Sequence, residues 1–222
     1  MSVVWKAFRV IGILFVVATV VILIGASLED SRTLKQKKWS SLGNFVCATS
    51  SSLLLVTGLS TWPSSLFAHE RGEAVAHCGD CGKCSTRQDI DIYAKTRNTL
   101  TSKSKTCALR SLWGGPEAVR DCFKKKVGFT PGCNTCWTEN VMCDRRFCVF
   151  TCLKSILLGE SNNRGEDKLS NCLLCDERMC GPAFIKCAGA NRRRCGITSD
   201  IGRDDQNELC QTIDVGWATG LN

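Results

Sequence analysis

Residues 133–152, CNTCWTENVMCDRRFCVFTC, place five cysteines among twenty residues, and this density decides what kind of fold the chain can have. Part of the stretch, CDRRFC at 143–148, returns as CDERMC at 175–180. Both copies read Cys-Asp-x-Arg, then an apolar residue, then Cys, and a C-x-x-C pair lies near each of them. The repetition suggests an internal duplication, and the alternative is a chance match within a cysteine-rich chain.

The cysteine-dense block extends outward from this stretch to residues 77–210. It holds sixteen of the 17 cysteines, and only Cys47 lies outside it. Such a density is typical of a disulfide scaffold, and the even number predicts eight disulfides within the block, of unknown pairing. The predicted disulfide-forming residues are Cys78, Cys81, Cys84, Cys107, Cys122, Cys133, Cys136, Cys143, Cys148, Cys152, Cys172, Cys175, Cys180, Cys187, Cys195 and Cys210.

The secondary structure predicted within the block is helical. Segments that fit short helices lie at 90–100, 116–126, 166–179 and 182–189. Pro116 follows Gly114-Gly115 and suits a first helical position, and lysines near residue 126 suit a last turn. No alternating apolar run exceeds four residues, so strand signals are poor. We predict a small, mainly α, disulfide-rich domain of short helices and loops.

The amino-terminal end has the pattern of a secretory signal. Lys6 and Arg9 precede an apolar run from Val10 to Ile24, and the small residues 25–27 follow it. Residues 1–28 are therefore predicted to be a signal peptide or an uncleaved signal anchor. A buried helix of a soluble protein is the alternative, which the absence of a polar face disfavours. Either form of signal sends the chain into the oxidising secretory pathway, where disulfides persist.

The rest of the chain divides around the cysteine-rich domain, for which we predict residues 77–214. Residues 29–76 are predicted to be a linker, basic at first and then rich in Ser and Thr. Its weakly apolar stretch at 42–59 is either part of that linker or a second membrane segment. Residues 215–222 are predicted to be a tail. The expected location is extracellular, at the cell surface or in an endomembrane lumen, with a single-pass membrane protein as one form.

Two kinds of cysteine chemistry compete with structural bridging. CGDCGKC at 78–84 contains two C-G-x-C units, as a thiol–disulfide oxidoreductase would, but polar residues 70–76 replace the hydrophobic strand that normally precedes such a motif. C-x-x-C pairs at Cys78, Cys133 and Cys172 could supply thiolates to zinc. Their long separations and the export signal favour disulfides instead, and no metal or cofactor is expected.

The remaining candidates concern binding. Arg192-Arg193-Arg194 could bind a phosphate, a sulfated glycan or an acidic lipid headgroup, and the alternative is a solvated loop. Trp113, Trp137 and Trp217 are expected to pack between disulfides, although an exposed one could stack on a glycan. The 29 Lys and Arg residues are spread along the chain, so no nucleic-acid partner is expected. The only two histidines, His69 and His77, precede the first cysteine of the dense block, Cys78, and so exclude a Ser-His-Asp triad or a Cys-His pair within the part that carries the cysteines.

Residues 133–152 and the stretch CGPAFIKCAGANRRRCGITSDIGRD at 180–204 resemble a group of uncharacterised cysteine-rich, signal-bearing proteins of microalgae and other protists. The resemblance covers about 77–214 and implies export and a self-contained domain, but no activity. The function predicted from the sequence is an exported or membrane-tethered, disulfide-stabilised binding or structural module. Its expected partners are a membrane, through the amino-terminal segment if that is uncleaved, and a surface glycan or protein.

Overall fold

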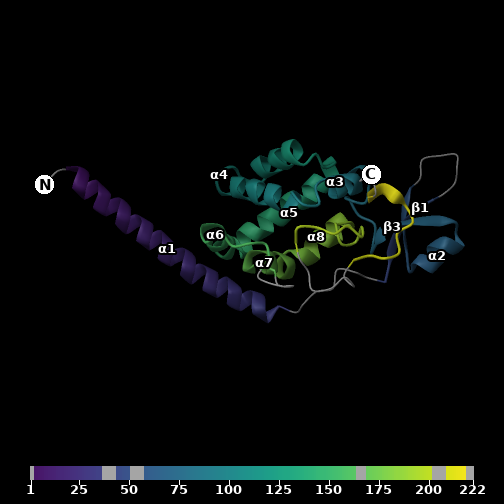
Figure 1. Ribbon diagram of the computed structural model, residues 1–222, viewed down its shortest axis with the longest axis horizontal. Coiled ribbons are helices and arrows are strands. Elements are labelled where there is room, and N and C mark those ends of the chain that lie inside the picture. Colours follow the sequence, from purple (N-terminus) through teal and green to yellow (C-terminus); the bar gives the residue numbers. More distant parts are fainter. Residues whose placement is uncertain (1–2, 37–43, 51–57, 164–168, 202–208, 219–222) are drawn as a thin grey trace.

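The computed structural model describes residues 3–36, 44–50, 58–163, 169–201 and 209–218. Its helices are α1 (Val3–Lys35), α2 (Ser65–Glu70), α3 (Arg87–Lys95), α4 (Leu100–Lys126), α5 (Pro131–Phe147), α6 (Val149–Leu157), α7 (Asn171–Met179), α8 (Gly181–Ala188) and the 3₁₀ turn η2 (Gly216–Ala218). Its strands are β1 (Val46–Ser50), β2 (Leu59–Trp62) and β3 (Glu73–Cys78). The predicted fold class, a small disulfide-rich and mainly helical domain preceded by an apolar helix, is confirmed (Figure 1).

Local signals place the helix ends. Gly115 has φ 59° and ψ −156°, which breaks α4 into two halves, and Pro116 begins the second half as predicted. Thr130 caps α5 by accepting a hydrogen bond from the Cys133 amide. Gly189, at φ 70°, ends α8 as predicted. These ends depend on residues a few positions apart, so the sequence alone could locate them.

Four disulfides join the segment that carries α5 and α6 to the segment that carries α7 and α8. They are Cys136–Cys187, Cys143–Cys180, Cys148–Cys175 and Cys152–Cys172. Taken in this order, the residue number of the first cysteine increases while that of the second decreases, so the two segments run antiparallel. We call this set the disulfide ladder. It pairs the two copies of the repeated motif, because the first cysteine of each copy bonds the last cysteine of the other.

The remaining disulfides correct the predicted set of bonded cysteines. They are Cys47–Cys81, Cys78–Cys210, Cys84–Cys133 and Cys107–Cys122. Cys195, predicted to be bonded, is instead a buried free thiol, and Cys47 takes the eighth disulfide. Burial raises the pKa of the Cys195 thiol, although Arg194 lowers it in part. Counting cysteines could not identify the odd one, because that depends on which two lie within bonding distance after folding.

The predicted linker at 29–76 is also wrong, since much of it is folded. α1 continues to Lys35, and residues 46–78 contribute a three-stranded antiparallel sheet in the order β2-β1-β3. Val46, Ala48, Ala68 and Val75 form its small core. The strands are four to six residues long, and their buried residues do not alternate, since Val46, Cys47, Ala48 and Thr49 of β1 are all buried. Within the weakly apolar stretch 42–59, residues 46–50 form the central strand, and 51–57 lie outside the described residues.

The predicted tail at 215–222 belongs in part to the folded domain. Val215 and Trp217 pack against the main core, and the Asp214 amide donates to the Val75 carbonyl. That core centres on aromatic rings: Trp137 lies 4.8 Å from Phe184 and 5.6 Å from Phe129 between ring centroids. Residues 219–222 lie outside the described residues. The carboxyl-terminal segment therefore bridges the sheet and the helices.

Helix α1 is attached to the domain only near its carboxyl end. Within Val10–Lys35, an 18-residue stretch has a mean hydropathy of 2.8 and is only 6% buried, so this helix is long and apolar enough to cross a membrane. Its last turns lie against α6 and α7, whereas its first part projects away from the domain (Figure 1). The helix thus combines an exposed apolar stretch with a docked end.

Candidate ligand-binding cleft

The cysteines of CGDCGKC bond in three different directions. Cys81 pairs with Cys47 on β1, Cys78 pairs with Cys210, and Cys84 pairs with Cys133 on α5. A thioredoxin-like site needs a disulfide between the two cysteines of one C-x-x-C unit, and the structure forms none within this segment. The motif instead joins the sheet, the carboxyl-terminal segment and the helices.

The cysteines also offer no thiolate zinc site among the described residues. All but Cys195 are disulfide-bonded, so no C-x-x-C pair retains free thiols. Ligand atoms of Asp144, Cys148 and Cys180 lie within 4.8 Å of one another. Both sulfur atoms of that group are in disulfides, with Cys175 and Cys143, and are not the deprotonated ligands that zinc requires.

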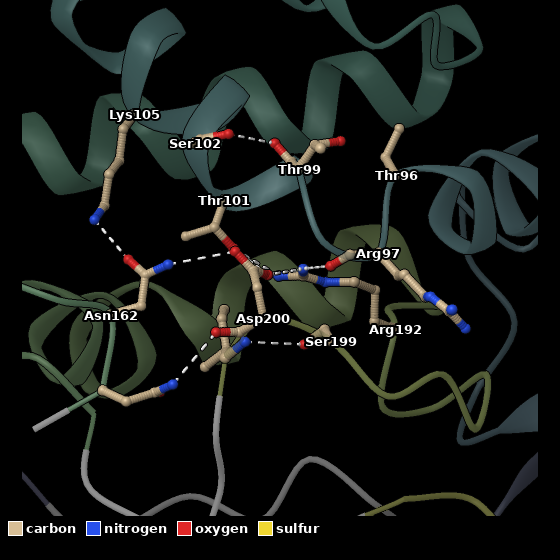
Figure 2. Close-up of polar contacts among 12 residues, drawn as sticks. Thr96, Arg97, Thr99, Thr101, Ser102, Lys105, Asn162, Arg192, Ser199 and Asp200 are labelled. Carbon is tan, nitrogen blue, oxygen red and sulfur yellow. Dashed lines mark hydrogen bonds and ion pairs between the residues drawn. The ribbon is translucent and has the colours of Figure 1, made fainter. Parts of the chain in front are cut away.

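Arg192, the first arginine of the predicted anion site, is buried in a polar network inside the domain (Figure 2). Its guanidinium donates to the Arg97 carbonyl at 2.7 Å and to Asp200 Oδ1 at 2.9 Å. Burial lowers the pKa of Arg192, and Asp200 offsets part of that effect. Asp200 also accepts a hydrogen bond from Asn162 Nδ2. The Oδ1 atom of Asn162 in turn accepts one from Lys105. The network therefore has a structural role, fixing α4 against the loop after α8.

The other two arginines face different partners. Arg193 is paired with Glu177 at 3.3 Å, and Arg194 donates to the Gly189 carbonyl at 3.0 Å. The Arg194 guanidinium lies so close to Gly79 that a side chain there would collide with it, and the Gly79 φ of 85° also favours glycine. Arg193 and Arg194 are buried, the Arg192 side chain is only 11% exposed, and all three make internal contacts. The geometry therefore supports neither the solvated loop nor a shared anion site.

A cleft of about 200 Å³ lies between α4, α5, α6, α7 and α8. Its walls are mainly apolar; examples are Leu109, Leu112, Val141, Leu153, Ile156 and Leu173. Leu109 and Ile156 are 40% and 44% exposed and form part of its rim. Ligand sites are typically concave and mostly apolar, with a few placed polar groups, and those for drug-sized ligands measure about 300–1,000 Å³. This cleft suits a smaller molecule.

The polar groups of the cleft come from the helices that the ladder joins. Asn140 on α5 donates from Nδ2 to Asp176 Oδ1 on α7 at 2.8 Å. Asp144, one turn after Asn140, is hydrogen-bonded to the same aspartate. Burial raises the pKa of Asp144 well above its usual range, and the neighbouring Asp176 raises it further. Burial and the adjacent Asp176 carboxyl therefore both favour the protonated, neutral form of the Asp144 carboxyl.

Three buried oxygen atoms that line this cleft have no hydrogen-bond partner in the described structure. They are Asn140 Oδ1, Asp144 Oδ1 and Ser104 Oγ. Asn140 as a residue is only 8% exposed, so its side-chain oxygen lies below the protein surface. A buried polar atom without a partner costs about 1–3 kcal/mol. The cleft thus presents unused hydrogen-bond acceptors within apolar walls.

Sequence reasoning did not find this cleft. The repeated Cys-Asp-x-Arg pattern contains Asp144 and Asp176, and it was the one available signal, since the antiparallel ladder brings the copies together. Predicting the contact required the pairing of the cysteines, which a sequence does not provide. Trp137, expected to pack between disulfides, does so and also lines the cleft.

Fold and site together define a disulfide-stabilised module with an amino-terminal apolar helix, as expected of an exported protein. Residues 116–212 match the model of a family described as a family of unknown function (DUF8771). The matched part begins at the second half of α4 and includes the whole disulfide ladder, but it excludes α1 and the sheet. No curated protein and no solved structure matches the chain. The resemblance to the microalgal and protist group stays a prediction.

Proposed function

We propose that the protein is a membrane-anchored binding module that holds a small, mostly apolar ligand carrying a hydroxyl group in the cleft. The observation that carries the proposal is the pair of unpartnered buried acceptors, Asn140 Oδ1 and Asp144 Oδ1. A hydroxyl placed between apolar walls would donate to one of them. That hydrogen bond would satisfy an acceptor that no other group of the described structure satisfies.

The charges around the cleft favour a neutral ligand. The lining of the cleft contains basic side chains, Lys105, Arg145, Arg192 and Arg193, together with the acidic Asp144, Asp176 and Glu177, so a charged ligand of either sign meets like charges. The acidic side chains at the polar end, Asp144 and Asp176, disfavour a carboxylate or phosphate there. An uncharged alcohol with a medium-length hydrocarbon part satisfies the acceptors without introducing a charge into a partly buried site.

The membrane anchor is supported by how α1 ends. Glu29 is 6% exposed, and its carboxylate accepts from the Thr151 amide at 2.8 Å. Ala26 is completely buried. A signal cleavage near residues 25–27 would put a charged amino group into this packed region. We therefore propose that α1 is retained as a signal anchor, with the disulfide domain on the exported side.

A matched pair of ligands tests the cleft. We would incorporate the full chain into lipid nanodiscs and titrate 1-decanol or decyl methyl ether, which differ in the hydrogen-bond donor. Binding would be followed by isothermal titration calorimetry, with the heat of the same titration into empty nanodiscs subtracted. One hydrogen bond to a buried acceptor is worth about 1.4 kcal/mol, so we expect about tenfold tighter binding of the alcohol.

Two variants complete the test. Leu153→Trp fills the cleft and is expected to abolish binding of both ligands, whereas Leu66→Trp, on exposed α2, is expected to leave binding unchanged. Asn140→Leu is expected to remove the preference for the alcohol. Equal affinities of alcohol and ether for the unmodified chain, or binding insensitive to Leu153→Trp, would overturn the proposal.

A further inference from the structure

The docked end of α1 fixes the direction of its exposed apolar part. Thr151, near the start of α6, donates from its amide to Glu29 and from its hydroxyl to Asp30 Oδ1 at 3.3 Å. On α7, Arg178 donates to the Thr33 carbonyl at 3.0 Å. The Phe150 ring lies so close to Gly25 that a side chain there would collide with it. Because α1 is one continuous helix through these contacts, the domain cannot swing freely about it.

Helix geometry then sets the depth of the domain relative to the bilayer. A hydrocarbon core of about 30 Å needs about 20 helical residues. Counted from Val10, where the apolar run begins, that length ends near Glu29. Residues 25–30 are the ones that contact α6. The start of α6 therefore lies at the level of the lipid headgroups.

The end of the domain that contains α6 also contains the bend of α4. Arg145, near the end of α5, donates to the Ser111 carbonyl at 2.7 Å, just before the bend at Gly115. Helix α6 begins directly after α5, with Cys148 as the single residue between the two helices. Figure 1 shows α4 and α6 at the end of the domain from which α1 projects, with the sheet at the opposite end.

Large apolar side chains are exposed at this end. Trp113, next to the bend of α4, is 90% exposed, and Leu157 and Leu158, at the end of α6, are 62% and 63% exposed. Leu109 and Ile156, the rim of the cleft, are exposed beside them. Tryptophan is enriched at membrane interfaces because one edge of its ring is polar and the rest apolar. We call these five residues the α4–α6 surface.

Basic side chains accompany the α4–α6 surface. Arg110, Arg145 and Arg146 are exposed on α4 and at the end of α5. Guanidinium groups pair with lipid phosphates, whereas apolar side chains next to them enter the region below the phosphates. This combination of chemistry, at the depth that α1 imposes, fits a bilayer better than it fits a soluble partner.

We propose that the α4–α6 surface lies on the bilayer that α1 spans, so that the cleft opens to the lipid phase between Leu109 and Ile156 and takes its ligand from there. The inference rests on the proposed membrane anchor and extends the proposed ligand site. It identifies the ligand as a neutral alcohol that partitions into lipid. It also explains why a rim of leucine and isoleucine is left exposed in an exported domain.

Quenching by labelled lipids tests this contact. The full chain would be placed in phosphatidylcholine and phosphatidylglycerol nanodiscs that contain a lipid with a nitroxide on its headgroup. The difference in emission between the unmodified chain and Trp113→Phe isolates Trp113. We expect the nitroxide to quench this component by more than half. The matched control is Trp62→Phe on β2, in the sheet at the opposite end, whose component is expected to be quenched by less than a tenth.

Further variants and a topology assay separate the possible failures. Leu157→Gln with Leu158→Gln is expected to halve the quenching of Trp113, and Leu66→Gln is expected to leave it unchanged. If alkaline carbonate extraction leaves α1 in the membrane but only soluble acrylamide quenches Trp113, the surface faces a soluble protein or glycan and this inference is wrong. If carbonate releases the chain, the proposed anchor is wrong as well.

Discussion

The helical region and the sheet region are held together in different ways. Along α5–α8, four disulfides join two segments that already carry their own helix signals. The sheet has a core of four small apolar residues, and one disulfide, Cys47–Cys81, ties its central strand to the chain after β3. Removing one disulfide should therefore lower the free energy of unfolding less where neighbouring disulfides join the same pair of segments.

The largest loss of stability is expected when the Cys47–Cys81 disulfide is removed. Removing it with Cys47→Ala and Cys81→Ala frees a loop with a sequence separation of 34, for which the chain-entropy relation gives about 4 kcal/mol of lost stability. Denaturant unfolding would measure the total, and hydrogen exchange should show that the amides of β1 lose protection first.

The matched control removes one disulfide of the ladder with Cys143→Ala and Cys180→Ala. Its neighbours Cys136–Cys187 and Cys148–Cys175 still hold the segments together. The loop that opens is therefore short, and the expected loss is about 3 kcal/mol. A larger loss for the control than for the sheet variant would contradict the comparison.

Acid is expected to act on the sheet region through His77. Burial lowers the pKa of this histidine to about 4. The hydrogen bond to the Cys78 carbonyl raises the pKa in part, and the nearby Arg194 lowers it further. The unfolded chain binds this proton near pH 6.5 and the native state only near pH 4, so stability is lost as the pH falls through that window. The loss amounts to about 3 kcal/mol below pH 4.

Chemical unfolding at several pH values would measure this dependence. His77→Gln retains a polar side chain beside Ser85 and should remove most of the slope between pH 6.5 and 4. His69→Gln replaces the exposed histidine and serves as the control, with the slope retained. An unchanged slope in His77→Gln would show that another group causes the acid sensitivity.

The helical region is expected to respond to pH in the opposite direction. Because burial and Asp176 raise the pKa of Asp144, the native state binds more protons than the unfolded chain above pH 4. Stability is therefore fully present below that pH and declines as the pH rises. Asp144→Asn removes this decline, so its melting temperature should exceed that of the unmodified chain at pH 8 and equal it at pH 3.5.

Differential scanning calorimetry at both pH values checks the Asp144 prediction. Asp91→Asn, at an exposed pair with Lys95 on α3, is the control and should show no stabilisation at pH 8. Destabilisation of Asp144→Asn at pH 8 would mean that the charged pair is required in the native state.

The smallest expected effect concerns the docking of α1. Glu29 places a carboxylate at the amino-terminal end of α6, where the helix dipole favours negative charge. Glu29→Gln should therefore cost about 0.3–1 kcal/mol. Hydrogen exchange of the Thr151 amide would detect it, and Glu117→Gln, an exposed residue in the second half of α4, should leave that amide unchanged.

The comparison also separates what could be predicted from what could not. In the helical region, Pro116 and Gly189 predicted helix ends that the structure confirms, because capping depends on neighbouring residues. In the sheet region, strands of four to six residues were missed, since their stability comes from pairing with distant segments. The cleft was missed for the same reason, as its polar end joins Asn140 to Asp176 across two helices.

By itself, the sequence determined that this protein carries a long apolar amino-terminal helix and a mainly helical domain rich in disulfides. Those features follow from hydropathy, local helix signals and cysteine density, which act over a few residues or need only counting. The tertiary structure decided that Cys47 is bonded and Cys195 is not, that the arginines at 192–194 are internal, and that two aspartates meet in a cleft. These depend on which distant residues come within a few ångströms of each other, and that distance is fixed only when the whole chain has packed.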